Sequence, residues 1–267
     1  MVKDTVDFGF ISENFIKVLS ALPTTLLITL LSLIFGWTLG LLLATGKISG
    51  SKWLKEILKW LTDIIRGIPT VVLLYVVYFG LPQVVEGLTG ISIGGWSKQT
   101  FVVIALTIEL GINSSEMFRS AYNSIKKGQL EAAWSLGFTK LQRFTRVILP
   151  QGLFVILPNL GSAVLSIIQA TALVYTLGIY DILGKARQID TNEAHVKTFE
   201  MYLVAAAIYW ALAGVVGVIF KRLEVHFGKG NVGISAKKKA SAPVKEKVSI
   251  PERVGVGISA RGRAVSA

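Results

Sequence analysis

The sequence contains no cysteine, only two histidines and little charge. The absence of cysteine excludes disulfide bonds, thiolate zinc sites and a cysteine nucleophile. His195 and His226 lie far apart in the chain and lack the spacing of metal ligands, so we expect each to be a surface or loop residue. Charged residues make up 16% of the 267 residues and hydrophobic residues 52%, whereas a soluble domain carries about 25% charged residues. The composition therefore argues against both a disordered chain and a soluble domain.

The apolar residues gather in long blocks, each of which can hold a membrane-spanning helix of about 20 residues. Charges are absent from residues 18–46, 67–85, 147–180 and 201–220. Residues 101–117 are also apolar but include Glu109 and Glu116, as in a polar helix that faces the interior of a bundle. We predict five spans, with residues 147–180 forming a bent helix and a partly re-entrant stretch at Gly178. A sixth span in this block is the alternative.

The basic residues predict the orientation of these spans, because lysine and arginine are retained on the cytoplasmic side. Residues 47–66 hold five basic residues and residues 119–146 hold six. The segments on the opposite side hold Lys3, Lys17, Lys98, Lys185, Arg187 and Lys197. Five spans then place the N terminus outside and the C terminus in the cytoplasm. The predicted fold is an all-α, polytopic membrane helical bundle.

The ends of the chain differ from the apolar part. We predict an external amphipathic segment at residues 1–17, a transmembrane domain at residues 18–225 and a basic, disordered cytoplasmic tail at residues 226–267. Residues 235–267 lack aromatic residues and hold eight basic and two acidic residues, so they carry half of the net charge of +12. Such a segment cannot bury enough apolar surface to fold.

The predicted cytoplasmic loop at residues 47–66 contains an amphipathic segment. Its apolar residues fall on one face of a helix and its charged residues elsewhere, which is typical of a helix that lies on the membrane surface. The alternative is a helix that packs on the cytoplasmic side of the protein. The apolar face consists of Trp53, Ile57, Trp60, Leu61 and Ile64.

Residues 128–150 predict a rigid helix, turn and helix on the cytoplasmic face. Residues 129–136 are compatible with a short helix, which Gly137 ends. Thr139 and Gln142 form a capping box for a second helix that leads to the membrane at Pro150. Exposed Ala132 and Ala133 would let the first helix lie closely in a groove of another protein.

This loop resembles the EAA loop of binding-protein-dependent ABC importer permeases. The resemblance rests on Glu131, Ala132, Ala133, Gly137, Leu149 and Pro150 in the spacing of that loop, with Val147 where isoleucine is more frequent. Residues 66–69, 78–82 and 116–129 resemble signatures of the polar amino-acid branch of the family. Several motifs in the same order over residues 18–225 make the resemblance specific.

The resemblance implies that the chain is the transmembrane subunit of an ATP-driven importer for polar L-amino acids, in a prokaryotic cytoplasmic (inner) membrane. Such a subunit works with a second permease copy or a homologous permease, and with an external solute-binding protein that meets the loops at residues 83–99 and 181–197. No Gly-x₄-Gly-Lys-Ser/Thr motif occurs. The chain would therefore bind no cofactor itself and is not an enzyme, and separate ATPase subunits would use ATP and Mg²⁺.

The third predicted span carries a polar stripe, because Glu109, Asn113 and Glu116 are spaced by four and three residues. A carboxylate within a membrane marks a functional site, and an amino acid carries an ammonium group that pairs with it. We therefore predict that this stripe, with Gln169 and Thr171 of the fourth span, lines the substrate pathway. Glu109 lies deeper in its apolar block and is the first choice for the ammonium. The alternative for Glu116 is a structural pair with Arg119 or Arg66.

The family pattern differs from this sequence near that pathway. Asn113 and Ser115 stand where tyrosine and alanine are usual, and Gln169 and Ala170 stand where lysine and aspartate are common. Because these differences fall near the expected pathway, they bear on which substrate is carried and not on membership of the family. Gly36 with Gly40, and Ala213 with Gly217, are small-residue pairs that predict close helix packing.

Three other functions remain as alternatives. A stand-alone secondary transporter would need ion-coupling residues and usually has paired internal repeats, which the sequence does not show. A membrane enzyme would need a catalytic constellation, and the charge alone prompts a nucleic-acid binder. The basic residues of the chain are instead explained by topology and by the tail.

Overall fold

The computed structural model describes residues 6–228, and no strand occurs within this range. The predicted tail beyond Gly228 lies outside the described residues, as do residues 1–5 of the predicted N-terminal segment. The elements are α1 (Phe8–Leu19), α2 (Leu22–Ser49), α3 (Lys52–Arg66), α4 (Thr70–Tyr75), the π-helix η1 (Val76–Gly80), α5 (Leu81–Thr89), α6 (Lys98–Asn123), α7 (Lys127–Ser135), α8 (Lys140–Arg143), the π-helix η2 (Phe144–Ile148), α9 (Leu149–Thr171), the 3₁₀-helix η3 (Val174–Leu177), α10 (Ile182–Asn192) and α11 (Thr198–Gly228).

The structure confirms the all-helical fold with five spans. The segments that are long and apolar enough to cross a membrane are Leu22–Ser49, Thr70–Thr89, Lys98–Asn123, Lys140–Leu177 and Thr198–Phe227. The long fourth block contributes a single candidate span. Its helix continues through Pro158 to Thr171, and the chain then turns through η3 to Gly178, whose φ of 73° suits glycine.

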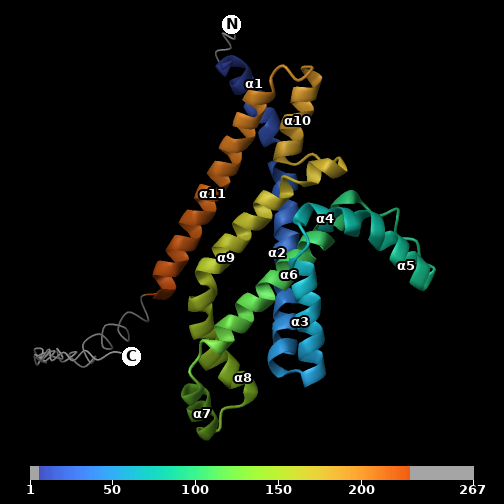
Figure 1. The fold of residues 1–267 in the computed structure, drawn as a ribbon. Helices are drawn as coiled ribbons and strands as arrows, with labels where there is room; N and C mark the ends of the chain where they lie inside the picture. The colour runs from blue at the N-terminus through green and yellow to red at the C-terminus, as the bar shows by residue number, and fades with distance from the viewer. Residues whose placement is uncertain (1–5, 229–267) are drawn as a thin grey trace, which may run out of the picture. The chain divides into compact units, whose positions relative to one another are not determined.

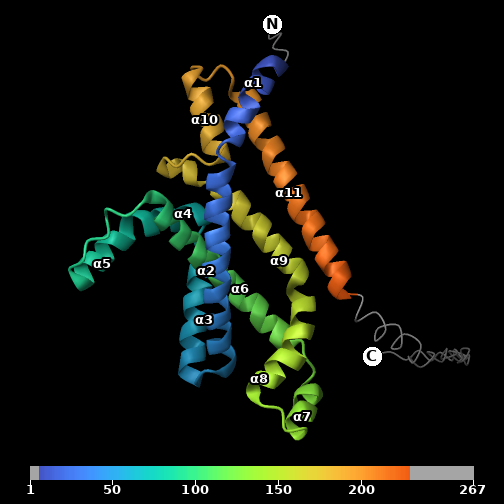
Figure 2. The ribbon, with the colours of Figure 1, turned by 180° about the vertical axis from the view of Figure 1, so that it is seen from behind.

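Helices α2 and α6 form the centre of the bundle (Figures 1 and 2). The buried residues of α2 recur every three or four positions, which places them on one face. A Cβ atom at Gly36 would lie 2.7 Å from Leu110 Cδ2, and one at Gly40 would lie 2.8 Å from Ser114 Cβ. The two helices approach closely because these positions have no side chain, which confirms the predicted packing role of Gly36 and Gly40. A Cβ atom at Gly217 of α11 would meet nothing within 4 Å in this chain.

We expect Gly40→Ala to destabilise the bundle by about 1–3 kcal/mol through overpacking. The added methyl group would meet Ser114 Cβ and, at 3.0 Å, the carbonyl oxygen of Gly111. Gly217→Ala adds the same methyl group where a Cβ atom meets no described atom within 4 Å, and it should leave the melting temperature equal or slightly higher, because alanine has the higher helix propensity. Thermal unfolding of both variants in detergent measures the difference, and equal melting temperatures would contradict the packing argument.

The amphipathic segment forms α3, which runs beside α2 (Figures 1 and 2). Thr62 is fully buried, and a Cβ atom at Gly46 of α2 would lie 2.6 Å from Leu58 Cδ1. Helix α3 therefore packs on α2 through Leu58 and Thr62. The apolar face predicted for this helix, represented by Trp53 and Trp60, points away from the chain and is exposed.

Helices α1, α10 and α11 meet at the end of the bundle opposite α7 and α8 (Figures 1 and 2). Asp181 is fully buried there, where it accepts hydrogen bonds from the N–H of Gly184 and the hydroxyl of Tyr209. Burial raises the pKa of the Asp181 carboxyl above its ordinary value. Asp7 caps α1 and accepts a hydrogen bond from Lys197, which lowers the pKa of the Asp7 carboxyl. These contacts attach α1 to the loop before α11.

Candidate functional site

Glu109 occupies a partly buried position on α6 with one carboxylate oxygen bound and the other without a partner. Oε1 accepts a hydrogen bond of 2.7 Å from the hydroxyl of Thr70, at the beginning of α4. Oε2 is buried and has no hydrogen-bond partner among the described residues. A buried carboxylate oxygen without a partner is costly. Glu109 can therefore accept a cationic group at little structural cost, because Thr70 already fixes the orientation of the carboxylate.

Glu116 has a different environment, two turns further along α6. Its Oε1 lies 2.5 Å from Lys47 Nζ, and its Oε2 pairs with Arg119 at 2.7 Å. Lys47 also donates to Ser115 and to Thr62, so this ion pair joins α2, α3 and α6. Glu116 thus forms the structural ion pair that was the alternative prediction, and its partner is Arg119 and not Arg66. Both oxygens of Glu116 are satisfied without a substrate.

Sequence reasoning missed the role of Lys47. It was counted only as a basic loop residue, whereas it is buried in the last turn of α2. Burying an ammonium group requires a charged partner. A lysine directly after an apolar block and a glutamate within another block are the signal that could have suggested this pair.

The other predicted pathway residues face different directions. Asn113 is exposed, as expected of the open side of the polar stripe. Gln169 is exposed as well, whereas Thr171 is fully buried and donates a hydrogen bond to the carbonyl of Ile168 in its own helix. The structure therefore does not bring Thr171 to the same surface as Gln169.

The predicted helix, turn and helix is present in the segment from α7 to α9. Gly137 has a φ of 76°, and the N–H of Phe138 donates to the carbonyl of Ala133, which ends α7. Thr139 and Gln142 form the predicted capping box. From Lys140 the chain is helical through η2 into α9, past Leu149 and Pro150, which are both exposed. The segment is therefore connected rigidly to the fourth span.

The exposed surface of α7 differs from the prediction at one residue. Glu131, Ala132 and Trp134 are exposed, but Ala133 is buried, with 4% of its surface accessible. The expectation that both alanines are exposed is wrong for Ala133, because consecutive helical residues point in different directions and this side of α7 packs on its own chain. Leu136 is 75% exposed and Trp134 70%, so the surface of this segment is more apolar than its alanines alone suggest.

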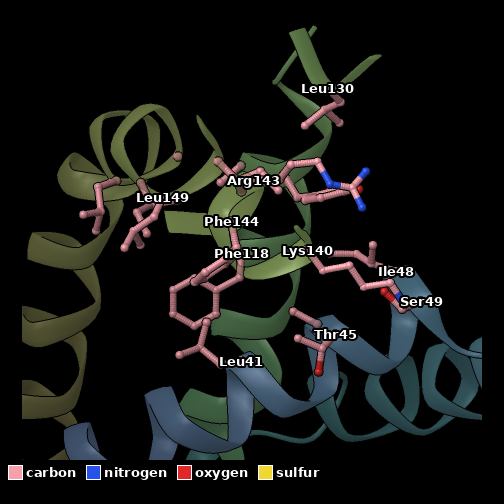
Figure 3. Close-up of a pocket in the computed structure, with 17 residues that line it drawn as sticks. Leu41, Thr45, Ile48, Ser49, Phe118, Leu130, Lys140, Arg143, Phe144 and Leu149 are labelled. Carbon is pink, nitrogen blue, oxygen red and sulfur yellow. The ribbon is translucent and has the colours of Figure 1, made fainter. Parts of the chain in front are cut away.

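A pocket of about 520 Å³ lies between α2, α6, α9 and the segment from α7 to η2. Figure 3 shows that Leu41, Phe118 and Phe144 gather at one side of it, while the side chains of Lys140 and Arg143 extend toward the other. Glu109 does not line this pocket. In the part of the chain that the structure describes, no group of three or more His, Asp or Glu residues is arranged to hold a metal ion.

Comparison with known proteins identifies similar chains over most of the sequence. The family described as binding-protein-dependent transport system inner membrane component matches residues 36–227. A probable amino-acid permease protein of Bacillus subtilis, YxeN, is 32% identical over 81% of this chain and 93% of its own length. The L-cystine transport system permease protein TcyL of the same organism is 32% identical over 83% of this chain and 92% of its own. A solved structure titled as an amino acid ABC transporter with histidines has a TM-score of 0.71 at 31% identity, covering 84% of this chain and all of that one.

Proposed function

We propose that this chain, which belongs to the family of binding-protein-dependent transport system inner membrane components, forms one half of the membrane pathway of an ATP-driven importer for polar L-amino acids. The family and the five apolar helices place the chain in the inner membrane as a multi-pass protein. The proposal of an amino-acid substrate rests on one observation. The second carboxylate oxygen of Glu109 is buried and has no hydrogen-bond partner among the described residues. The ammonium group common to amino acids would supply that partner.

The proposed substrate pathway follows the polar side of α6 that carries Glu109 and Asn113. Glu109 would bind the ammonium group, while Asn113 and Gln169 would offer neutral hydrogen bonds from two helices that pack together. Glu116 would hold the pathway helix in place through Lys47 rather than touch the substrate. Thr171 would support the end of α9 from within the chain. A second permease, identical or homologous, would complete the pathway.

The segment from α7 to α9 would transmit the closure of the ATPase subunits. Its exposed Glu131, Ala132 and Trp134 form a surface that a separate ATPase, which uses ATP and Mg²⁺, would bind. Because the helix runs without interruption from Lys140 into the fourth span and the turn at Gly137 joins α7 to it, movement of α7 would rotate that span as a rigid body. An external solute-binding protein would deliver the substrate to residues 83–99 and 181–197.

The orientation of the chain completes the proposal. The basic segments around the α2–α3 turn and at α7 and α8 lie at one end of the bundle, and α1 and α10 lie at the other (Figures 1 and 2). The basic end would be cytoplasmic, which is the side on which ATP is available.

Uptake by proteoliposomes tests this function. The permease is reconstituted with its ATPase and binding-protein partners, and labelled polar amino acids are offered outside. We expect uptake with ATP inside and none with ADP, because the energy comes from the partner ATPase. Uptake by the permease alone, driven by an ion gradient without ATP, would contradict the proposal and support the stand-alone secondary transporter.

A further inference from the structure

The pocket near α7 and α8 has an apolar wall built from several helices. Leu41 belongs to α2, Phe118 to α6, Phe144 to η2 and Leu149 to the beginning of α9. Its volume of about 520 Å³ lies within the range of roughly 300–1,000 Å³ that small-molecule sites occupy. These walls fit a hydrocarbon chain, because apolar area that is removed from water stabilises a complex.

The opposite side of the pocket is cationic. Lys140 and Arg143 are its charged lining residues, and no acidic side chain of residues 6–228 lines it. Neither residue forms an ion pair within residues 6–228. The Nε atom of Arg143 is buried and lacks a hydrogen-bond partner in that range. A buried guanidinium N–H without a partner is costly, and a phosphate oxygen would satisfy it with a charge-assisted hydrogen bond.

The position of the pocket in the bundle limits what can fill it. It lies beside the C-terminal half of α2 and the beginning of α9, where two candidate spans reach the basic end of the protein. This end is predicted to be cytoplasmic, and anionic lipids of the cytoplasmic leaflet are attracted to lysine and arginine beside a span. A phospholipid matches the two sides of the pocket, because it has an anionic group at one end and a hydrocarbon chain at the other.

We propose that this pocket binds an anionic phospholipid of that leaflet, with its phosphate on Lys140 and Arg143 and one acyl chain against Leu41, Phe118 and Phe144. The bound lipid would contact both the central helices and Leu149. It would thereby hold the segment from α7 to α9 against the membrane-embedded part of the chain.

Photolabelling of the purified complex with its partner subunits tests the site. The probe is phosphatidylglycerol with a photoreactive group in one acyl chain, and phosphatidylcholine with the same chains is the comparison. We expect phosphatidylglycerol to label peptides that contain Leu41 or Phe118, with labelling by phosphatidylcholine at least several-fold lower. Phosphatidylcholine has the same phosphate but a compensating cation, so equal labelling by the two lipids would overturn the proposed preference for an anionic lipid.

Charge-removing variants locate the headgroup. Lys140→Gln and Arg143→Gln should each weaken phosphatidylglycerol binding about fivefold, which is the effect of one basic residue at an anionic membrane surface. Arg146→Gln is the matched control, because Arg146 lies one turn further, outside the pocket, with its guanidinium over the Phe138 ring at 5.7 Å from the centroid. An equal loss in all three variants would show general attraction to the surface and would overturn the site.

The remaining occupant to exclude is a second permease copy. The chain has no cysteine, so Thr45→Cys places one thiol at the lining of the pocket. We expect this thiol to form no crosslink between permease copies and to lose reactivity toward a maleimide when phosphatidylglycerol is added. Efficient crosslinking between copies would show that protein covers the pocket and would overturn the proposal. These measurements read binding and not uptake, so their outcome is independent of the proposed transport function.

Discussion

We expect Glu109→Gln to lower ATP-driven amino-acid uptake about tenfold or more, because a hydrogen bond to a charged group contributes about 1.5–3 kcal/mol. Glutamine keeps the size of the side chain and an oxygen that accepts from the Thr70 hydroxyl, as Glu109 Oε1 does at 2.7 Å. The negative charge facing the substrate ammonium group is lost. We expect the variant to assemble normally with its ATPase partners, and uptake by proteoliposomes measures the effect.

Glu116→Gln is the contrasting variant on the same helix. It removes the charge that pairs with Lys47, whose side chain is only 5% exposed. A buried cation that loses its partner is destabilising, so we expect a lower melting temperature and less assembled complex for Glu116→Gln. Normal uptake of every polar amino acid by Glu109→Gln would remove Glu109 from the substrate site. A loss of assembly equal to that of Glu116→Gln would instead assign Glu109 a structural role.

We expect Gly137→Val to uncouple ATP hydrolysis from uptake, with roughly five- to thirtyfold less substrate carried per ATP, since a left-handed conformation costs a residue with a Cβ about 1–2 kcal/mol. The cause is conformational, because a Cβ atom at Gly137 meets nothing within 4 Å while its φ is 76°. Relief of this strain would move α7 relative to α8, and the ATPase would then close on a displaced surface. Uptake and stimulated ATP hydrolysis are measured on the same proteoliposomes.

Two further variants separate conformation from bulk. Gly137→Asn should retain most of the coupling, because asparagine tolerates the left-handed region better than other residues with a side chain. Gly128→Val adds the same bulk within α7, where a Cβ atom also meets nothing within 4 Å and φ is not positive. We expect it to leave coupling near normal. Unchanged stimulated hydrolysis and uptake in Gly137→Val, with a normal amount of bound ATPase, would refute the role of this turn.

The predictions that the structure confirms depend on residues close together in the chain. The five spans follow from the lengths of the apolar blocks. The end of α7 follows from Gly137, and the start of α8 follows from Thr139 and Gln142, three residues apart. Such signals need no knowledge of the tertiary structure, because the hydrogen bonds that they satisfy lie within one or two helical turns.

The structure differs from the sequence-based predictions where residues that are far apart in the chain contact each other. The prediction for Ala133 was wrong because the side on which α7 packs depends on its neighbours α8 and η2. The amphipathic pattern of α3 did not indicate whether its apolar face would be turned toward the chain. Its path beside α2 depends on the close approach at Gly46 and on the buried Thr62.

The sequence by itself determined that this protein is a five-span helical membrane protein with a rigid helix, turn and helix between its third and fourth spans. The tertiary structure decided which of the two glutamates on α6 is available. Lys47, 69 residues before Glu116, binds one oxygen of that carboxylate, and Arg119 binds the other. Thr70, 39 residues before Glu109, binds only one oxygen of the Glu109 carboxylate. The spacing along one helix places both carboxylates on one face, but Lys47 and Thr70 come from other helices. Only the packing of α2 and α4 against α6 brings these two side chains within hydrogen-bonding distance of the glutamates.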